Sequence, residues 1–552
     1  MMQKNIRVAC IQVQASSMQK HKENKEHILQ AITQTAQSKP DLMVLPECVY
    51  PCYFLSPQII ENKQTIARIT DQFVQEIKNK AKQFRTFIAV GIPEYIPQEN
   101  FFYNTALLIS DEGKEIGRSR KSFLWHFDYR WFKSEHHYQV FNTKIGKIGL
   151  FVCADGRLPE IIRCLALQDA EILLDLTNWV TNGLEIEKWS NPQAEFIIPT
   201  RALENKLWIV AANKIGYEEK SIQYCGKSAF FSPEGNIIAM ASSDREDILV
   251  QDIDLMQSHD KNIDNQVDVF NSRHPEKYHL LTQATYSLPV CQELEKDKAK
   301  VLPNPLAAVV QIGKASDVQM QSQKIDYFLS RLNEQEVNII SFSQIDEWSP
   351  QSNCFLVDSL INLTQNKNII CTVTLNENKN GQQSKSVYLF ESGKIRGQYQ
   401  KTHLFPPKKE GKETNINDFP VFETRYGRIG LMLDYEGFFP EIARILCLKG
   451  AQIIIWPCLF SKNEQIKICQ TRSAENKIFM ICPNAIYGNY NGHSLITSPS
   501  GQVIAGCLQN EEIASMSRLN LHLANDKTIV PHTHAIMGRQ PEAYYALIST
   551  LH

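Results

Sequence analysis

The chain has 552 residues, more than one hydrophobic core usually serves, so we expect two domains of roughly 250 residues each. Hydrophobic residues make up 43% of it and the formal net charge is −2, which gives no basic excess to attract nucleic acid or an anionic membrane. No run of about 18 apolar residues predicts a membrane span, and the first residues lack the apolar core of a signal peptide. The composition thus indicates a cytoplasmic globular protein that has no nucleic-acid or membrane partner.

The first 47 residues predict a strand, a helix and a second strand. The apolar run IRVACIQVQA is typical of a buried strand, and KENKEHILQAITQTAQ follows it with apolar residues at helical spacing. The second buried strand, DLMVLPE, ends at Glu47. Because a carboxylate at the end of a buried strand is costly to desolvate, Glu47 needs a structural or functional reason to be there.

The same order of elements recurs in the second part of the chain. LAAVVQIG, DVQMQSQKIDYFLSRL and NIISFSQ again predict strand, helix and strand, and the last of them ends at Gln344. Further blocks match in the same order, namely FNTKIGKIGLFVC with FETRYGRIGLMLD, TRALENKLWIVAAN with TRSAENKIFMICPN, and RHPEKY with RQPEAY. Since chance matches would not stay collinear, the chain contains two copies of one domain whose loops differ in length.

The two copies are separated by CQELEKDKAKVLPNP, a charged segment flanked by prolines. Such a composition is typical of a linker between domains. We therefore predict a first domain at residues 1–290, a linker at residues 291–304 and a second domain at residues 305–552.

Fourteen cysteines are scattered along the chain without an even framework of pairs. In a chain of this length, that pattern is typical of free thiols in a reducing compartment. Cys48 and Cys52 form a close pair, but no second pair completes a zinc site. We therefore expect no metal site and interpret Cys52 as a packing residue.

Three motifs follow one another in the first copy. VLPE ends at Glu47, GRSRK ends at Lys121, and GKIGLFVC ends at Cys153 and continues as ADGRLPE. In this order and with these neighbours, the motifs resemble the carbon–nitrogen hydrolase (nitrilase-like) superfamily, and the resemblance covers both copies. It implies an α/β protein of two tandem αββα four-layer sandwich domains, which pair within the chain as a pseudo-dimer. It also implies catalysis without a metal or another cofactor.

The chemistry of amide hydrolysis explains these residue types. A nucleophile must attack the carbonyl carbon, a base must move protons, and a cation must stabilise the tetrahedral oxyanion. The resemblance assigns these roles to Cys153, Glu47 and Lys121, respectively. The backbone N–H of Ala154 is placed to help hold the oxyanion. Attack by the thiolate would release ammonia and leave a thioester, which water then hydrolyses.

The family often carries a second acid between the lysine and the cysteine, and two acids of this chain lie in that window. Asp128 is favoured, because DYRWF resembles the family's pattern of an acid followed by aromatic residues. Glu135 is the alternative, and it is otherwise assigned to substrate binding. The sequence leaves open which of the two is the second acid.

Other residues near the motifs are candidates for contact with the substrate. Arg157 lies at a family position that meets a substrate carboxylate, although pairing with Asp155 or Glu160 is an equally weighted alternative. Asn178 and Trp179, in the sequence LTNW, are expected to line the pocket wall.

The second copy keeps the lysine but changes the two other groups. Lys401 matches Lys121, whereas Gln344 replaces the glutamate and Asp434 replaces the cysteine. Gln344 cannot accept a proton as a carboxylate does, so we predict that this site is inactive. The paired changes conserve formal charge, and they avoid two carboxylates about 4 Å apart that would repel by roughly 4 kcal/mol at an effective dielectric constant of 20. We expect Asp434 to form an ion pair with Lys401.

The motifs predict a thiol hydrolase that cleaves a non-peptide C–N bond of a small amide or N-carbamoyl compound and releases ammonia. CADGRLPE resembles the amidase and carbamoylase branches more than the Cys-Trp-Glu sequence of nitrilases, so hydrolysis of a small nitrile is the first alternative. A non-catalytic scaffold with two inert copies is the second. The sequence leaves open the substrate, a scaffold or regulatory role for the second copy, and any further homo-oligomer.

Overall fold

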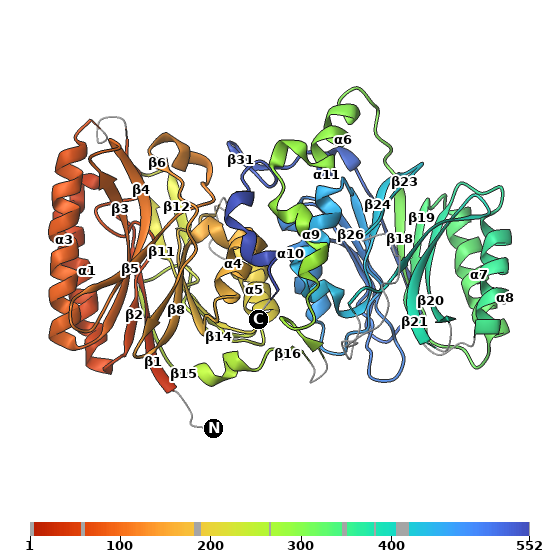
Figure 1. Cartoon of the computed structure of the whole chain (residues 1–552), viewed down its shortest axis with the longest axis horizontal. Coiled ribbons are helices and arrows are strands. Elements are labelled where there is room, and N and C mark those ends of the chain that lie inside the picture. The colour runs from red at the N-terminus through yellow and green to blue at the C-terminus, as the bar shows by residue number, and fades with distance from the viewer. Residues whose placement is uncertain are drawn as a thin grey trace. The chain divides into compact units, whose positions relative to one another are not determined.

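The computed structural model describes residues 5–56, 61–181, 189–263, 267–344, 350–379, 382–403 and 419–550. The chain divides into two compact units (Figure 1). Unit 1 consists of Met1–Asn262, Val530–His534 and Gly538–Leu547, and unit 2 consists of Ile263–Ile529, Ala535–Met537 and Ile548–His552. Each unit therefore contains one of the repeated copies together with a short stretch from the end of the other copy.

Unit 1 is built on two sheets, of which the first has the strand order β12–β11–β1–β2–β3–β4–β5, with β15 also beside β1 and β6 beside β4. Its central strands β1, β2 and β3 run parallel, and β4 and β5 continue the sheet antiparallel. The strands are β1 Asn5–Gln14, β2 Leu42–Val44, β3 Phe87–Ile96, β4 Phe101–Ile109, β5 Glu115–Arg120, β6 Phe132–Lys133, β11 Lys214–Glu218, β12 Ile222–Cys225 and β15 Asp247–Asp254.

The second sheet of unit 1 has the order β14–β13–β10–β9–β8–β7. Its central strands β8, β9 and β10 are parallel. Parallel strands are usually covered on both faces, and β9 and β10 are buried at every residue. The strands are β7 Val140–Thr143, β8 Gly146–Val152, β9 Ile172–Leu176, β10 Trp208–Ala212, β13 Ala229–Phe231 and β14 Ile237–Met240.

Helices cover the outer face of each sheet and complete an αββα sandwich in unit 1 (Figure 1). α1 (His21–Thr35) and α3 (Lys63–Phe84) pack on the first sheet, and α4 (Pro159–Ala166) and α5 (Ile198–Asn205) cover the second. The buried residues of α3 recur every three or four positions, which gives this helix one apolar face. The expected strand–helix–strand order of the first 47 residues and the expected sandwich are both confirmed.

Unit 2 repeats this plan with the sheets β22–β21–β20–β19–β18–β29 and β23–β24–β25–β26–β27–β28. α7 (Val318–Glu334) and α8 (Pro350–Thr364) cover the first sheet, and α9 (Pro440–Leu448) and α10 (Glu464–Asn476) cover the second (Figure 1). The strands are β18 Leu306–Gln311, β19 Ile339–Phe342, β20 Ile370–Lys379, β21 Gln382–Glu391, β22 Lys394–Gln400, β23 Val421–Thr424, β24 Gly427–Leu431, β25 Ile453–Ile455, β26 Phe479–Cys482, β27 Leu495–Thr497, β28 Val503–Gly506 and β29 Ile513–Arg518.

The segment expected to be a linker at residues 291–304 begins inside a helix. α6 (Pro289–Asp297) belongs to unit 2 and buries Val290 and Asp297. Asp297 Oδ2 accepts a hydrogen bond from Arg428 Nη2 at 2.6 Å. The other charged side chains of α6 are exposed or half-buried, so the sequence resembles a linker although the segment is packed. By their contacts, the two compact units divide between Asn262 and Ile263.

Three strand ends of unit 1 carry the predicted catalytic residues. Glu47 lies shortly after β2, Lys121 follows β5 directly, and Cys153 follows β8 directly. β2 is paired in parallel with β3 in the first sheet, and β8 is paired in parallel with β9 in the second. Residues just beyond the carboxyl ends of parallel strands are the usual place for a site in an α/β protein.

Gly91 allows β3 to pass close to the backbone that carries Glu47. A Cβ added at Gly91 would lie 2.5 Å from the Pro46 carbonyl oxygen and 2.6 Å from Glu47 Cα, so this backbone would have to move. We predict that Gly91→Ala lowers the free energy of unfolding by roughly 1–3 kcal/mol, as measured by urea denaturation. Gly506→Ala is the matched control, because its added Cβ meets only Val503 Cγ1, at 3.9 Å. An equal loss in both variants would contradict this explanation.

Candidate active site

A buried lysine lies between two buried carboxylates in unit 1. Lys121 Nζ is 2.9 Å from Glu47 Oε1 and 2.8 Å from Asp128 Oδ2. The Lys121 side chain is 1% exposed and both carboxylates are 0% exposed. Removing charges from water costs several kcal/mol for each ion, so such a cluster persists only where further bonds hold its geometry. Asp128, the favoured second acid, is the acid that the structure brings to the lysine.

Glu135, the alternative second acid, does not reach this cluster, and that assignment is corrected. Its side chain is 41% exposed, and Glu135 Oε1 accepts a hydrogen bond from Arg120 Nη1 at 2.9 Å. Only the backbone of Glu135 approaches, with its N–H bonded to the Lys121 carbonyl oxygen at 3.3 Å. The physical reason is local, because the 3-10 helix η3 (His126–Arg130) buries Asp128 whereas Glu135 lies on an outer stretch.

One oxygen of Glu47 is held by hydrogen bonds, and the other is open. Asn104 Nδ2 and Lys121 Nζ both donate to Glu47 Oε1, at 2.5 and 2.9 Å. Glu47 Oε2 is buried and has no hydrogen-bond partner among the described residues. Burial raises the pKa of Glu47; Lys121 opposes this rise and Asp128 adds to it. A carboxylate with a raised pKa and an open oxygen is well suited to accept a proton.

Cys153 begins the 3-10 helix η4 (Cys153–Arg157) in a strained conformation. Its φ is 49°, in the left-handed region that costs a residue with a side chain on the order of 1–3 kcal/mol. The Cys153 N–H donates to Asp175 Oδ1 at 3.0 Å, and this bond helps to hold the turn. The turn places the cysteine directly at the carboxyl end of β8, where its side chain is buried.

Burial favours the protonated form of the thiol, and the two carboxylates favour the charged form of the lysine. Burial raises the pKa of the Cys153 thiol; Glu47 adds to the rise and Lys121 opposes it. Burial lowers the pKa of Lys121, but Asp128 and Glu47 outweigh it and leave this pKa well above its usual value. Moving the thiol proton to Glu47 leaves the net charge of the buried cluster unchanged. Cys153 therefore does not need a low pKa of its own to become a thiolate.

Asp155 joins the lysine segment to the cysteine segment. Asp155 Oδ1 accepts the N–H groups of Ser122 and Phe123, at 3.0 and 2.7 Å. Its Oδ2 accepts the N–H of Val152 at 3.1 Å. One buried carboxylate therefore fixes the backbone after Lys121 and the backbone before the nucleophile. Burial raises the pKa of Asp155 to about 7, although these three N–H groups oppose the rise.

Asp128 is oriented by groups that lie outside the three motifs. Asp128 Oδ1 accepts the Tyr53 hydroxyl at 2.7 Å, and Asp128 Oδ2 accepts the Trp125 N–H at 2.8 Å. Glu218 in turn accepts the backbone N–H of Tyr53 at 2.7 Å. Sequence reasoning missed Tyr53, Asn104 and Glu218, because their roles depend on contacts between distant elements. Only Tyr53 gave a signal, since it lies in the stretch YPCYFLSPQII, which follows shortly after Glu47.

Arg157 is a buried cation that no carboxylate of the described residues neutralises. Its Nε donates to Gln193 Oε1 at 3.0 Å, and its guanidinium carbon lies 4.5 Å from the centre of the Trp125 ring. The pairing with Asp155 or Glu160 that the sequence left open is not formed. Burial lowers the pKa of Arg157 to about 10, and the neighbouring cysteine opposes this shift.

Asn178 and Trp179 follow β9 and are buried, at 7% and 1% exposure. Both side-chain polar atoms of Asn178 and the Nε1 of Trp179 have no hydrogen-bond partner among the described residues. Because buried polar atoms rarely stay unsatisfied, these atoms are suited to meet a ligand. From the sequence, we expect the loops YPCYFLSPQII and WVTNGLEIEKW to set the shape of the pocket, and both fall partly outside the described residues, at 57–60 and 182–188.

Unit 2 keeps the backbone of this site and changes its side chains. Asp434 begins the 3-10 helix η11 (Asp434–Phe438) with a φ of 51°, as the cysteine does in unit 1. Its Oδ2 lies 2.9 Å from Lys401 Nζ, so the expected ion pair is present. Glu436 accepts the N–H of Thr402 at 3.0 Å, as the matching acid does in unit 1. Gln344 is fully buried after β19, in the place of the glutamate.

A second lysine enters the unit 2 site and changes its balance of charge. Lys385 Nζ is 3.6 Å from Asp434 Oδ2. Lys385 occupies the position that Asn104 has in unit 1. The Lys385 carbonyl oxygen accepts the backbone N–H of Lys401 at 3.0 Å, and the Asn104 carbonyl oxygen accepts that of Lys121 at 2.8 Å. Among the described residues, the site therefore carries a cation where unit 1 has a neutral asparagine, which the sequence comparison of Gln344 and Asp434 did not include.

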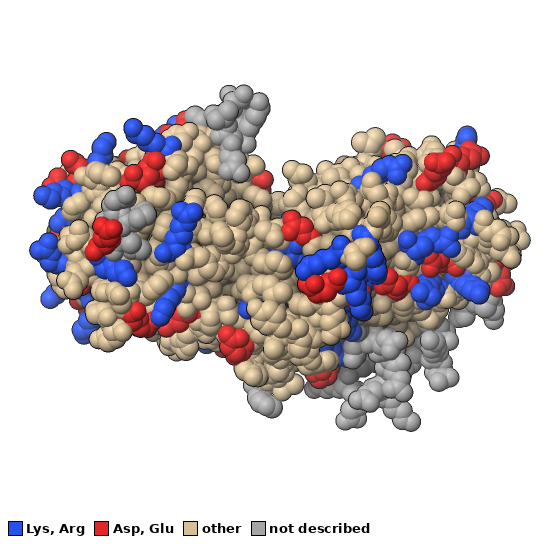
Figure 2. All heavy atoms as spheres, turned by 90° about the horizontal axis from the view of Figure 1, so that it is seen from above, with Lys and Arg blue, Asp and Glu red and all other residues tan. Residues whose placement is uncertain are grey.

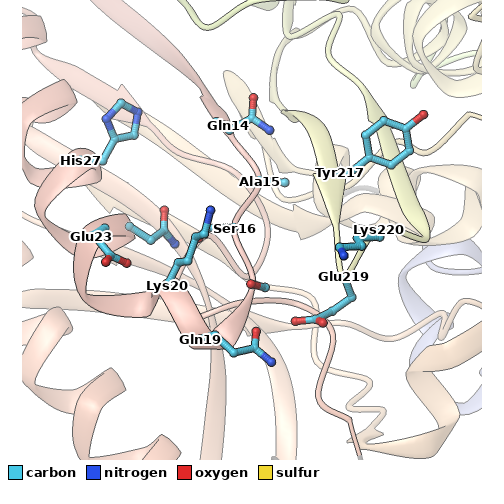
Figure 3. Close-up of a pocket in the computed structure, with 12 residues that line it drawn as sticks. Gln14, Ala15, Ser16, Gln19, Lys20, Glu23, His27, Tyr217, Glu219 and Lys220 are labelled. Atoms are coloured by element: carbon cyan, nitrogen blue, oxygen red, sulfur yellow. The ribbon is translucent and has the colours of Figure 1, made fainter.

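A hollow of about 780 Å³ lies at the carboxyl end of β1 in unit 1 (Figure 3). Its lining comes from the end of β1, the start of α1 and the turn between β11 and β12, and includes Gln14, Glu23, His27, Tyr217 and Lys220. None of the predicted site residues lines it. The hollow is therefore separate from the buried cluster around Lys121.

The remaining expectations about metals, thiols and charge concern the whole molecule. Within the described part of the chain, no group of three or more His, Cys, Asp or Glu side chains is arranged to hold a metal ion. The cysteines whose side chains are described are free thiols. Across the described ranges, no helix has both the length and the apolar sequence needed to cross a membrane. Basic and acidic side chains are mixed on the face shown in Figure 2.

The chain belongs to the carbon-nitrogen hydrolase family, since residues 7–260 and 306–525 both match the family described as Carbon-nitrogen hydrolase. The two matches fall on the two copies and confirm a tandem duplication within the nitrilase superfamily. A nitrilase of Pyrococcus abyssi is 29% identical over 277 residues, which are 50% of this chain and 99% of that protein.

Two further similar proteins are amidases by name. N-carbamoylputrescine amidase of Solanum lycopersicum is 28% identical over 229 residues, covering 39% of this chain and 75% of the relative. The crystal structure of an amidase from Nesterenkonia sp. matches 48% of this chain and 95% of its own, at 22% identity and a TM-score of 0.41. Each of these proteins therefore matches about half of this chain or less.

Asp434→Asn tests the ion pair of unit 2. The substitution leaves Lys401 and Lys385 close together without the carboxylate they share, so we predict that the free energy of unfolding falls by roughly 1–3 kcal/mol. Added salt should recover part of this loss by screening the two lysines, and urea denaturation at two salt concentrations measures both effects. As a control, Glu112→Gln removes a solvent-exposed pair with Lys114 and should leave the midpoint unchanged. An Asp434→Asn variant that is as stable as this control would contradict the ion-pair interpretation.

Proposed function

We propose that unit 1 hydrolyses a small amide or N-carbamoyl compound through a thioester on Cys153 and releases ammonia. The observation that carries this proposal is the Lys121 ammonium held between Glu47 and Asp128, beside the strained cysteine turn. These residues supply the base, the nucleophile and the fixed positive charge that acyl transfer to a thiol requires. Membership of the carbon-nitrogen hydrolase family supports the same class of reaction.

In the first half of the cycle, Glu47 Oε2 takes the thiol proton and the Cys153 sulfur bonds to the carbonyl carbon. The π electrons of the C=O bond move to the oxygen, and this oxyanion faces the Lys121 ammonium and the Ala154 N–H. The C–N bond then breaks, and the nitrogen takes the proton from Glu47 and leaves as ammonia. A thioester remains on the sulfur.

In the second half, water attacks the thioester carbon while Glu47 Oε2 takes one of its protons. Collapse of the second oxyanion breaks the C–S bond, the thiolate regains its proton from Glu47, and the acid product leaves. The base therefore acts twice, which suits a carboxylate held at Oε1 and open at Oε2. The raised pKa of Lys121, caused by its two carboxylates against the opposing effect of burial, keeps the cation charged throughout.

Arg157 supports a substrate that carries an anionic group near the bond that breaks. Its guanidinium is buried without a partner carboxylate among the described residues, so a carboxylate of the substrate would both neutralise it and accept hydrogen bonds from it. Asn178 and Trp179 would meet polar atoms of the same substrate through the side-chain groups that lack partners in the described residues.

Nitrile hydrolysis is the second candidate, because the similar protein of Pyrococcus abyssi is named a nitrilase. Attack of Cys153 on a nitrile carbon would give a thioimidate, and addition of water with loss of ammonia would give the same thioester. Since both substrates lead to one acyl-enzyme, the catalytic residues do not separate them, and only the reaction with defined substrates does.

An ammonia-release screen of the full chain with small amides, N-carbamoyl compounds and nitriles tests the proposal. We predict release from amides or N-carbamoyl compounds, fastest for those that carry a carboxylate, and a loss of at least about 10³-fold in Cys153→Ala. Arg157→Met should cost carboxylate-bearing substrates about tenfold or more in kcat/KM and leave neutral amides little changed. Release from nitriles alone would favour the second candidate. No release from the whole panel would leave the scaffold alternative.

The pH dependence of kcat/KM should report the raised pKa of Glu47. Glu47 must be deprotonated to act as the base, and burial raises its pKa, so activity should be lost on acidification at a pH above the ordinary glutamate pKa of about 4.3. Initial rates measured between about pH 3 and pH 10 locate this acid limb. The variant Glu47→Gln should lose most of the activity and should also lose the acid limb of the profile. An acid limb at or below the ordinary glutamate value would contradict the role of Glu47.

A further inference from the structure

We propose that the end of the chain positions the active-site segment of unit 1, so that the second copy supplies part of the working hydrolase. The C-terminal tail is Val530–His534 and Gly538–Leu547, which belong to unit 1. The active-site segment is residues 122–128. The tail, in dark blue, lies beside α4 (Figure 1). The inference rests on the proposed function, since it concerns the same site.

Thr533 holds the turn between Lys121 and Asp128. Its Oγ1 accepts the N–H of His126 at 2.8 Å and donates to the Leu124 carbonyl oxygen at 3.3 Å. His126 has a φ of 44° and begins η3, the short helix that carries Asp128. Because this conformation is strained, the bonds that hold His126 also determine where the Asp128 carboxylate lies.

Two other tail residues pack against elements of the site. Arg539 Nε lies 3.0 Å from Glu160 Oε1, and these side chains are 0% and 2% exposed. Glu160 is in the first turn of α4, shortly after the turn that begins at Cys153. A Cβ added at Gly538 would lie 2.3 Å from Phe123 Cε2, so the tail backbone packs directly on the active-site segment.

Unit 2 has a matching ion pair formed by the end of the first copy. Arg273 Nε lies 3.0 Å from Glu441 Oε1, with side chains 1% and 2% exposed. Arg273 and Arg539 occupy the same position in the repeated sequences RHPEKY and RQPEAY. The two ion pairs are therefore equal in chemistry and burial, but only the pair of Arg539 lies in the unit that contains Cys153.

Thr533 and Arg539 act as positioning residues. Their contacts are with the backbone of the active-site segment and with α4, and not with the reacting atoms. A loosened segment would misplace Asp128 and, through it, the lysine that faces the oxyanion. Since that interaction belongs to the transition state, the loss should appear in kcat more than in KM.

Thr533→Val and Thr533→Ser, made in the full chain, form the first test. Valine keeps the shape of the side chain but loses both hydrogen bonds, whereas serine keeps the hydroxyl. With the best amide of the screen, kcat should fall roughly tenfold in Thr533→Val and stay within about twofold of wild type in Thr533→Ser, with KM little changed. A wild-type rate in the valine variant, or equal losses in both variants, would overturn the role of Thr533.

Arg539→Gln and Arg273→Gln form the second test, because they remove matching ion pairs. Both variants should lower the thermal unfolding midpoint by similar amounts, and only Arg539→Gln should also lower kcat, by roughly tenfold or more. Equal effects of the two variants on kcat would show that the tail acts only through general stability, and would overturn the inference.

Hydrogen exchange separates failure of this inference from failure of the proposed function. Mass spectrometry of peptides that cover residues 122–128 should show faster amide exchange in Thr533→Val than in wild type, and no change in Arg273→Gln. If wild type releases no ammonia but exchange responds in this way, the proposed function fails and the positioning role stands. If ammonia is released and neither exchange nor kcat responds to Thr533→Val, the positioning role is wrong.

Discussion

Unit 1 depends on keeping one ammonium group and two carboxylates together where water is excluded. A pair of charges about 4 Å apart gains roughly 4 kcal/mol at an effective dielectric constant of 20, while each buried ion loses several kcal/mol of hydration. The balance is favourable only if the groups are held at hydrogen-bond distance and their remaining atoms are satisfied. Tyr53 meets this need for Asp128, and Asn104 adds a second bond to Glu47 Oε1, whereas Glu47 Oε2 has no partner among the described residues. Glu47 and Lys121 are held close together because both follow strands of the first sheet.

The altered site of unit 2 separates what the fold requires from what the chemistry requires. Asp434 keeps the left-handed turn, Glu436 keeps the bond to the lysine segment, and Lys401 keeps its place. The groups that would move protons and attack a carbonyl are the ones that differ, and Lys385 arrives with them. The strained turn is therefore a property of the fold in both units, and strain at Cys153 does not by itself indicate catalysis. Whether a site can be catalytic depends instead on which side chains lie on that turn and around it.

The sequence predicts those parts of the site that belong to contiguous motifs. Glu47, Lys121 and Cys153 each end a recognisable stretch, and the collinear repeat predicts two domains of one plan, whose sandwich architecture the family resemblance implies. Asn104 and Glu218 could not be found in this way, because their partners come from elements far away in the chain. The choice between two nearby acids also depended on a short helix that sequence spacing does not reveal. Likewise, RHPEKY and RQPEAY show a repeated segment but not the unit on which each one packs.

The most direct measurement is mass spectrometry of the full chain quenched in acid during turnover of an amide, followed by peptide mapping. We predict one acyl group per chain, located on the peptide that contains Cys153 and absent from Cys153→Ala. Glu47→Gln should hold any acyl group that forms for longer, because water then lacks its base. Ammonia release without an adduct on Cys153, or an acyl group on Asp434, would contradict the account.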